Sequence, residues 1–507
     1  MNLHPDTHAA PATLTHEGEA ILFPPLPYDI GARADAATAN PALQKIVSSA
    51  ARLKDTGRKT ICPDVFGDNY NAMRAHAGAI KQHTLDHADH YLEQFVDHAT
   101  AAGATVHFAA DAEQANAICL DIARDEGGRL CVKSKSMVTE ETHLVPALER
   151  IGVETVESDL GEFIIQIDGD APSHIVQPMI HKDRTSVGRA FERVLNVPYT
   201  EEPEALAAIA RDHLRDKYRH ADLGITGANF LVADTGSVVI CTNEGNGRFC
   251  SSAPRVHVVV AGFEKLLPRC EHLALFLKLL ARSATQQPLT CYTHVMTGPR
   301  RGAEPDGPEQ MHIILVDNGR SEILRAPSRE LLRCIRCGAC LNACPVYRTI
   351  GGHAYGGVYS GPIGALVTPL LRGLENYRDL PHASSLCGAC YEACPVKIDI
   401  PRHLIRLRAE QNRQRISKAS DRLMYRLWGA SLRYPVTYRI AGFMQKLMMR
   451  WGARRHGTLE QGDRYRDRGW IEHAPGPLSG WTSQRDLPTP TASDFRHWWR
   501  HRDGDRP

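Results

Sequence analysis

Two clustered runs of cysteine constrain this chain more than any other feature of its sequence. The first run has the spacing C-x2-C-x2-C-x3-C followed by proline, and the second repeats its last three cysteines and the proline. The seven cysteines are Cys334, Cys337, Cys340 and Cys344, then Cys387, Cys390 and Cys394. Bacterial ferredoxins hold 4Fe–4S clusters with this spacing. A zinc site has no use for the later cysteines at these offsets or for the proline. The sequence therefore predicts iron–sulfur clusters and electron transfer.

The second run lacks a leading cysteine, and Ser384 occupies that position. In two-cluster ferredoxins the last cysteine of a run binds the other cluster. One cluster is then expected to have Cys334, Cys337, Cys340 and Cys394 as ligands, and the other Cys344, Cys387 and Cys390. The second cluster is either 3Fe–4S, or 4Fe–4S with Ser384, water, a substrate or a partner as its last ligand.

Length and composition place these motifs in a large globular chain. With 507 residues, 43% hydrophobic and 23% charged, the chain is expected to form two or three domains. Thiolate ligands require a reducing compartment. No apolar stretch approaches the length of a membrane span, and the first 30 residues lack the pattern of a signal peptide. These features predict a cytoplasmic protein, with peripheral contact at the inner face of the membrane left open.

The region before the cysteines alternates strand and helix patterns, which favours an α/β fold with a largely parallel sheet. Residues 234–236 read DTG and predict a hairpin. Strands are expected at 104–109, 130–132, 153–156, 163–167, 229–233, 237–242 and 256–261, and helices at 41–54, 71–100, 112–124 and 140–151. The cysteine region itself is expected to be helical.

Two loops of the α/β region are candidate ligand sites. The first carries Lys133 and Lys135 directly after a predicted strand, where sheets of this kind bind anions. The second contains Asn243, Glu244 and Gly245. It begins like a nucleotide-binding loop, but a cysteine replaces the third glycine, which disfavours a dinucleotide site. Ordinary turn chemistry is the alternative for both loops.

At these residues the chain resembles the lactate utilization protein B family. Residues 132–141 read VKSKSMVTEE and are similar to the opening motif of the LUD domain. Its later motifs are matched by DLGE at 159–162, PSHI at 172–175, IHK at 180–182, GITGAN at 224–229 and TNEGN at 242–246.

The resemblance implies an LUD domain of CoA-transferase/deaminase-like α/β fold, followed by an α-helical ferredoxin domain with two clusters. It also implies a complex that oxidises L-lactate to pyruvate. The implied partners are a cysteine-rich-domain iron–sulfur protein, a small LUD protein, and a quinone or other electron acceptor. We expect an N-terminal arm at 1–60, the LUD domain at 61–310, the ferredoxin domain at 325–408 and a basic helical segment at 409–507.

The basic segment has a strong excess of positive charge, which the net charge of the whole chain conceals. Residues 401–456 contain 14 Lys or Arg against two acidic residues, although the whole chain has a net charge of only +2. Large apolar side chains alternate with these cations in an amphipathic pattern. Such helices bind anionic membrane surfaces, acidic partners or an acidic surface of their own chain. No recognisable nucleic-acid fold accompanies the charge, so nucleic acid is not an expected partner.

Two functions from different classes follow from these patterns. The first is an iron–sulfur electron-transfer subunit of an L-lactate-oxidising complex, or of a complex for another 2-hydroxy acid such as glycolate. The second is a non-catalytic redox sensor, in which the LUD domain binds the ligand and the clusters report it. Turnover with an electron acceptor distinguishes the two.

Overall fold

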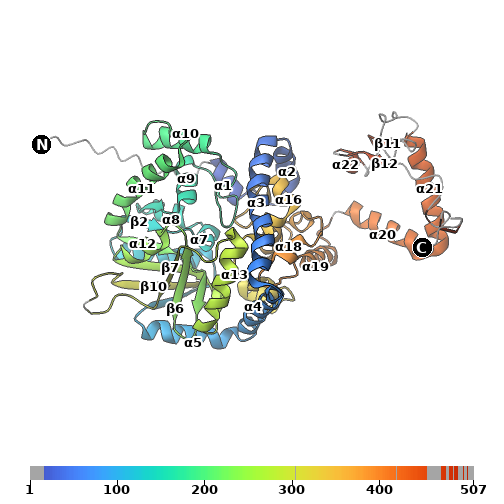
Figure 1. Ribbon diagram of the computed structural model, residues 1–507. Helices are drawn as coiled ribbons and strands as arrows, with labels where there is room; N and C mark the ends of the chain where they lie inside the picture. The colour runs from blue at the N-terminus through green and yellow to red at the C-terminus, as the bar shows by residue number, and fades with distance from the viewer. Residues whose placement is uncertain are drawn as a thin grey trace. The chain divides into compact units, whose positions relative to one another are not determined.

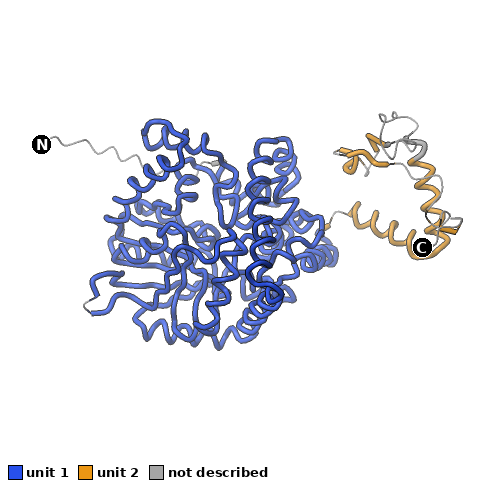
Figure 2. Tube along the Cα trace, in the orientation of Figure 1, with its two compact units in different colours: residues 1–416 blue, residues 417–507 orange. Residues whose placement is uncertain are grey.

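The computed structural model describes residues 16–302, 304–417, 419–453, 470–474, 479–483, 485–488, 495 and 499–500. The chain divides into unit 1, residues 1–416, and unit 2, residues 417–507 (Figure 2). The boundary therefore falls after Ile416, later than the expected end of the ferredoxin domain at residue 408. The first 15 residues of the predicted N-terminal arm lie outside the described residues. Among the described residues, every helix is too short or too polar to cross a lipid bilayer.

A six-stranded sheet, parallel throughout, forms the centre of unit 1 (Figure 1). Its strands, in spatial order, are β1 (Thr105–Ala109), β10 (Gln310–Val316), β7 (Val256–Gly262), β4 (Leu223–Thr226), β2 (Leu130–Lys133) and β3 (Glu154–Glu157). β7 is buried along its whole length, as expected for a central parallel strand with both faces covered. The expectation of an α/β fold with a parallel sheet is confirmed.

Side chains alternate between the two faces of this sheet. Val258 and Val260 pack against helices α6 (Ala112–Asp125) and α8 (Leu144–Arg150) on one face. Val259 and Ala261 pack on the other face against α5 (Ala88–Ala101) and a second sheet. The second sheet has the order β8 (Leu266–Leu267), β5 (Phe230–Val232), β6 (Ser237–Thr242) and β9 (Tyr292–Met296). β5 and β6 pair antiparallel, as the hairpin prediction requires.

Three predicted elements of this region are wrong. One is the helix expected at 140–151, which is interrupted at Thr142 and His143 between α7 (Met137–Glu141) and α8. Residues 163–167 lie in helix α9 (Leu160–Asp168) instead of a strand. Asp159 caps this helix by accepting a hydrogen bond from the Glu162 backbone N–H, and the short apolar run fits a buried helix as well as a strand. The single helix expected at 71–100 is divided at His87 into α4 (Asn69–Asp86) and α5.

The cysteine region is helical, as expected. A short helix lies within each cysteine run, and Figure 1 shows the long helix α3 (Pro41–Phe66) beside this region. α3 packs on α15 and α16, and its Val47 belongs to the same hydrophobic cluster as Leu341 and Tyr347, so part of the predicted arm belongs to the core of unit 1. The helices here are α15 (Ala339–Ala343), α16 (Pro345–Ile350), α17 (Gly361–Arg372), α18 (Ala389–Ala393) and α19 (Ile400–Arg413), with 3-10 turns η3 (Arg329–Arg333), η4 (His353–Tyr355) and η5 (Leu380–His382).

The remaining helices of unit 1 surround these parts. They are α1 (His16–Leu22), α2 (Ile30–Thr38), α7 (Met137–Glu141), α10 (Arg184–Leu195), α11 (Pro203–His220), α12 (Asn246–Ser252), α13 (Leu273–Thr285) and α14 (Arg320–Arg325). The described part of unit 2 contains α20 (Ala419–Arg433), α21 (Pro435–Ala453), α22 (Ser479–Thr482) and a pairing of β11 (Trp470–Ile471) with β12 (Leu487–Pro488). No described residue of α20 is buried, and Leu427, Trp428 and Phe443 are exposed.

Candidate functional site

Four cysteines line one small cavity with apolar walls. They are Cys334, Cys337, Cys340 and Cys394, called the four-cysteine set below. The first three come from one run and Cys394 from the other, which is the grouping that crossed ligation requires. Ile363, Val396 and Ile398 form part of the wall. The structure therefore brings together four thiols from two distant segments around one space, which Arg336 also lines.

The other three cysteines form a second group, called the three-cysteine set: Cys344, Cys387 and Cys390. Burial raises the pKa of the Cys390 thiol to about 12, and the nearby Cys344 and Cys387 thiols also raise it. Cys387 is exposed, so this set reaches the surface of unit 1. Thiols in such an environment ionise only when a bound metal supplies positive charge. Both sets fit iron–sulfur clusters, which would supply one-electron transfer when bound.

The two runs have the same local backbone. Gly338 and Gly388 adopt left-handed conformations, with φ of 73° and 84°, immediately before α15 and α18. Arg336 and Leu386, two residues earlier, also have positive φ values of 57° and 55°. A non-glycine residue in this region is strained, and the strain recurs at the same position of each run. The second run is thus a structural repeat of the first.

Ser384 occupies the place of Cys334 in this repeat. The Arg336 backbone N–H donates to Cys334 Sγ at 3.4 Å, and the Leu386 backbone N–H donates to Ser384 Oγ at 3.1 Å. The later cysteines receive similar bonds, with the Tyr347 N–H donating to Cys344 Sγ at 3.5 Å and the Ile398 N–H to Cys394 Sγ at 3.3 Å. The Ser384 hydroxyl therefore stands where a thiolate ligand stands in the other run.

A cavity of about 330 Å³ opens at the carboxyl ends of β2, β4 and β7, and is called the strand-end cavity below. Of the residues predicted from the two loops, Lys135, Asn243 and Glu244 line it. Burial raises the pKa of the Glu244 carboxyl to about 7, helped by the charge of Asp159. Gly245 does not line the cavity; it has a φ of 78° and starts helix α12.

Lys133 does not border the strand-end cavity, contrary to the sequence prediction. Its side chain is fully buried, with Nζ 2.6 Å from Glu157 Oε1 and 3.0 Å from Glu140 Oε1. Burial alone would lower the pKa of Lys133, but the charges of Glu157 and Glu140 raise it instead. Lys133 and Glu157 are neighbours on the paired strands β2 and β3. The physical reason for the difference is therefore a cross-strand ion pair, which sequence alone does not reveal.

The far end of the strand-end cavity contains residues that the sequence analysis did not select. Lys265, Arg336 and Tyr359 line it there, and the Arg336 guanidinium lies 4.2 Å from the centre of the Tyr359 ring. Arg336 and Ile175 line both this cavity and the cavity of the four-cysteine set. The position of Arg336 inside the first cysteine run was a signal available in the sequence.

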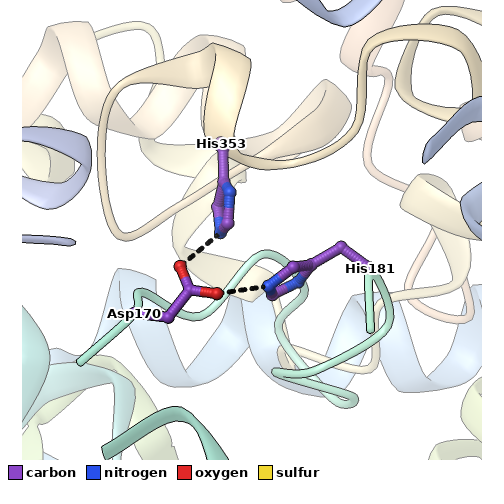
Figure 3. Close-up of side chains that lie close together, drawn as sticks. All are labelled: Asp170, His181 and His353. Atoms are coloured by element: carbon purple, nitrogen blue, oxygen red, sulfur yellow. Dashed lines mark hydrogen bonds and ion pairs between the residues drawn. The ribbon is translucent and has the colours of Figure 1, made fainter. Parts of the chain in front are cut away.

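A separate group consists of Asp170, His181 and His353 (Figure 3). Asp170 Oδ2 accepts from His181 Nε2 at 2.9 Å and lies 2.6 Å from Lys182 Nζ. His353 Nε2 lies 2.7 Å from the carbonyl oxygen of Ala171 and donates to it. Burial lowers the pKa of His353 to about 4. Because protein partners already use these ligand atoms, we interpret the group as a polar link between the 169–183 loop and the cysteine region.

Comparisons with known proteins agree with the division of the chain into an α/β region, a cysteine region and a C-terminal segment. The LUD domain family matches residues 92–316, the 4Fe-4S dicluster domain matches residues 330–398, and the family described as Lactate utilisation protein B, C-terminal, matches residues 406–504. The chain can also be superposed on the crystal structure of a DUF162 family protein from Deinococcus radiodurans. The superposition covers 45% of this chain and 97% of the Deinococcus chain, with 15% sequence identity and a TM-score of 0.27. This weak likeness adds nothing to the assignment.

Several relatives named Lactate utilization protein B are similar to this chain over nearly their whole length. The Bacillus velezensis protein is 43% identical, covering 86% of this chain and 89% of its own. The Bacillus licheniformis protein is 44% identical, also covering 86% and 89%. The Bacillus subtilis protein is 42% identical, covering 86% and 88%. The chain belongs to the lactate utilization protein B family.

Proposed function

We propose that this protein is the iron–sulfur electron-transfer subunit of a complex that oxidises L-lactate to pyruvate. The family assignment and the dicluster match support a role in lactate utilisation through iron–sulfur chemistry. The carrying observation is the gathering of the cysteines into a four-cysteine set and a three-cysteine set. Oxidation of lactate to pyruvate releases two electrons and two protons, and two one-electron clusters match that number of electrons.

We further propose that Ser384 is the last protein ligand of the second cluster, which is then 4Fe–4S. The support is the repeat of backbone conformation and the equivalent hydrogen bonds to Cys334 Sγ and Ser384 Oγ. Serine Oγ and cysteine Sγ are both bonded to Cβ, so equivalent backbone conformations direct both atoms toward their cluster. The alternatives are a water ligand or a 3Fe–4S form. Replacement of Ser384 by alanine distinguishes both of them from ligation by serine.

Electrons would leave through the three-cysteine set, because Cys387 is exposed whereas Cys337 and Cys394 are buried. The proposed recipients are the other lactate-utilization subunits, a cysteine-rich-domain iron–sulfur protein and a small LUD protein, and then a quinone or another acceptor. The exposed apolar and basic faces of α20 and α21 would bind an acidic surface of one of these subunits.

The test is lactate-dependent reduction in a reconstituted complex. The anaerobically purified protein should contain about seven or eight irons per chain and absorb broadly near 400 nm, as bound clusters require. With the partner subunits present, L-lactate should bleach this absorption and support turnover with an artificial acceptor. Each subunit should be assayed alone and in combination, with D-lactate and glycolate as the control substrates. Zinc in place of iron, or lactate binding without turnover in every combination, would contradict the proposal, and the second result would favour the sensor.

A further inference from the structure

We propose that the strand-end cavity binds a small carboxylate, a 2-hydroxy or 2-oxo acid, between Lys265 and Arg336, and that the bound anion changes the electron affinity of the cluster in the four-cysteine set. The choice of acid rests on the proposed function. The binding site itself rests on the geometry of unit 1.

The two cavities share a wall. Arg336 and Ile175 line both the strand-end cavity and the space between the four thiols. Arg336 also lies between Cys334 and Cys337 in the chain, and its backbone N–H donates to Cys334 Sγ. A charge bound beside the Arg336 guanidinium is therefore separated from the cluster position by one layer of side chains. At this depth water screens a charge weakly, so its effect on the cluster is large.

Arg336 has a donor available for a ligand. Its side chain is 10% exposed, and Nη1 is buried without a hydrogen-bond partner in the described structure. Nη2 lies 3.9 Å from Glu264 Oε1, beyond hydrogen-bond distance. Arg320 Nε donates to Glu264 Oε2 at 2.7 Å, whereas Glu264 Oε1 is buried without a hydrogen-bond partner in the described structure. A buried guanidinium nitrogen without an acceptor is unfavourable, and a carboxylate of matching geometry would satisfy it.

Lys265 supplies the second cation. It is 9% exposed, it lines the same end of the cavity, and no hydrogen bond or ion pair of its ammonium appears among the described residues. Burial lowers the pKa of Lys265 to about 8, so it is mostly charged at neutral pH. Of the charged side chains that line the cavity here, the two cations Arg336 and Lys265 outnumber the one carboxylate, that of Glu264. This end of the cavity therefore has a net positive charge.

The other end of the cavity is different. Lys135 faces the charges of Asp159 and Glu244, which offset its own. An anion would therefore prefer the end near Arg336. A cavity of about 330 Å³ lies at the small end of the range for small-molecule sites, so a three-carbon acid would fit there together with water. The rival explanation is that Lys265 and Arg336 only offset the negative charge of a thiolate-bound cluster.

The experiment measures pyruvate binding to the anaerobic, cluster-loaded full chain by calorimetry. Pyruvate is the probe because it cannot reduce the cluster as lactate could. We expect one site, and a more negative midpoint potential for the four-cysteine cluster when pyruvate is bound, because a nearby anion disfavours the added electron. By linkage, the reduced protein should bind pyruvate more weakly by the same factor. No binding to the oxidised wild-type protein would overturn the proposal and leave the rival explanation.

The key variant is Lys265→Met, which should weaken pyruvate binding about 10- to 100-fold by removing one charge-assisted hydrogen bond. Lys265→Arg retains the cation and should retain most of the affinity for pyruvate. If Lys265→Met folds poorly, retained affinity in Lys265→Arg identifies the positive charge as the cause of binding. Lys278→Met, an exposed position of α13 away from the cavity, is the matched control. Equal affinity in Lys265→Met and wild type would overturn the proposal. Because binding is measured without turnover, its outcome is independent of whether the reconstituted complex oxidises lactate.

Discussion

Lys133→Met is the substitution that tests the structural role of the first loop most directly. Methionine retains most of the length and apolar stem of lysine but removes the ammonium that Glu157 and Glu140 contact. The Glu157 side chain is only 7% exposed, so its carboxylate would be buried without a cation. Breaking a buried ion pair in this way typically costs about 3–5 kcal/mol of the free energy of unfolding. For a cooperative region of the size of the LUD domain, this corresponds to a melting temperature lower by about 6–20 °C.

The loss should depend on pH, because Glu157 can take up a proton. Burial already raises the pKa of Glu157 to about 7 with Lys133 present, and removal of the cation should raise it further. A carboxyl whose pKa is higher in the folded than in the unfolded protein binds more protons when folded, so stability falls as pH rises. Wild type shares this behaviour below about pH 7, because its Glu157 is also protonated there in the folded protein. The stability difference between variant and wild type should therefore change little between pH 5 and 7 and increase by up to about 1.4 kcal/mol per pH unit from pH 7 to 8.

The assay is anaerobic differential scanning calorimetry at one scan rate, with iron content measured on the same samples. Lys278→Met is the matched control, because it also replaces a lysine of unit 1 by methionine and Lys278 is exposed and has no ion pair among the described residues. Its melting temperature should change little at any pH. The reasoning is wrong if Lys133→Met melts within about a degree of wild type at pH 8, or if its deficit is the same at pH 5 and pH 8.

Three further predictions concern the clusters and the C-terminal helices. Cys334→Ser should alter the EPR signal of the four-cysteine cluster and Cys387→Ser that of the other; a change of both signals in each variant would contradict two separate sets. Ser384→Ala should change the EPR spectrum of the second cluster, whereas Ser385→Ala should not, and an unchanged spectrum in Ser384→Ala would exclude the serine as a ligand. Truncation after Ile416, the end of unit 1, should leave the iron content intact and weaken co-purification with the partner subunits, as high salt should also do. Aggregation or iron loss would instead indicate that the segment packs on its own chain, and retention only by anionic vesicles would indicate a membrane role.

The truncation point itself is a result of the structure. A boundary after Arg408, as the sequence suggested, would cut α19 in its middle. The residues removed would include Gln411, which is buried and donates to the Arg378 carbonyl oxygen. Such a truncation would damage the cysteine region for reasons unrelated to partner binding, so the later boundary is required.

The sequence by itself determined the parts of this protein that depend on local pattern. Cysteine spacing is enough to predict the ligands, because a run of this kind builds its turns and its N–H donors from residues within the run. Four strands of the central sheet, β1, β2, β3 and β7, were predicted for the same reason, since their apolar runs and turn residues are contiguous, whereas β4 and β10 of the same sheet were missed. The α9 helix was missed although Asp159 and Glu162 have the spacing of a helix cap, and a closer weighing of that signal against the apolar run would have found it.

Only the tertiary structure decided which charged residues lie in the cavity and which support the fold. Lys133 and Lys135 are two positions apart and chemically identical, but β3 places Glu157 beside the first and leaves the second at the cavity. Lys265 follows β7 and Arg336 follows the first cysteine of its run, and they meet only because the cysteine region packs against the carboxyl edge of the sheet. Pairing between distant segments sets these contacts, and no pattern within one segment contains that information.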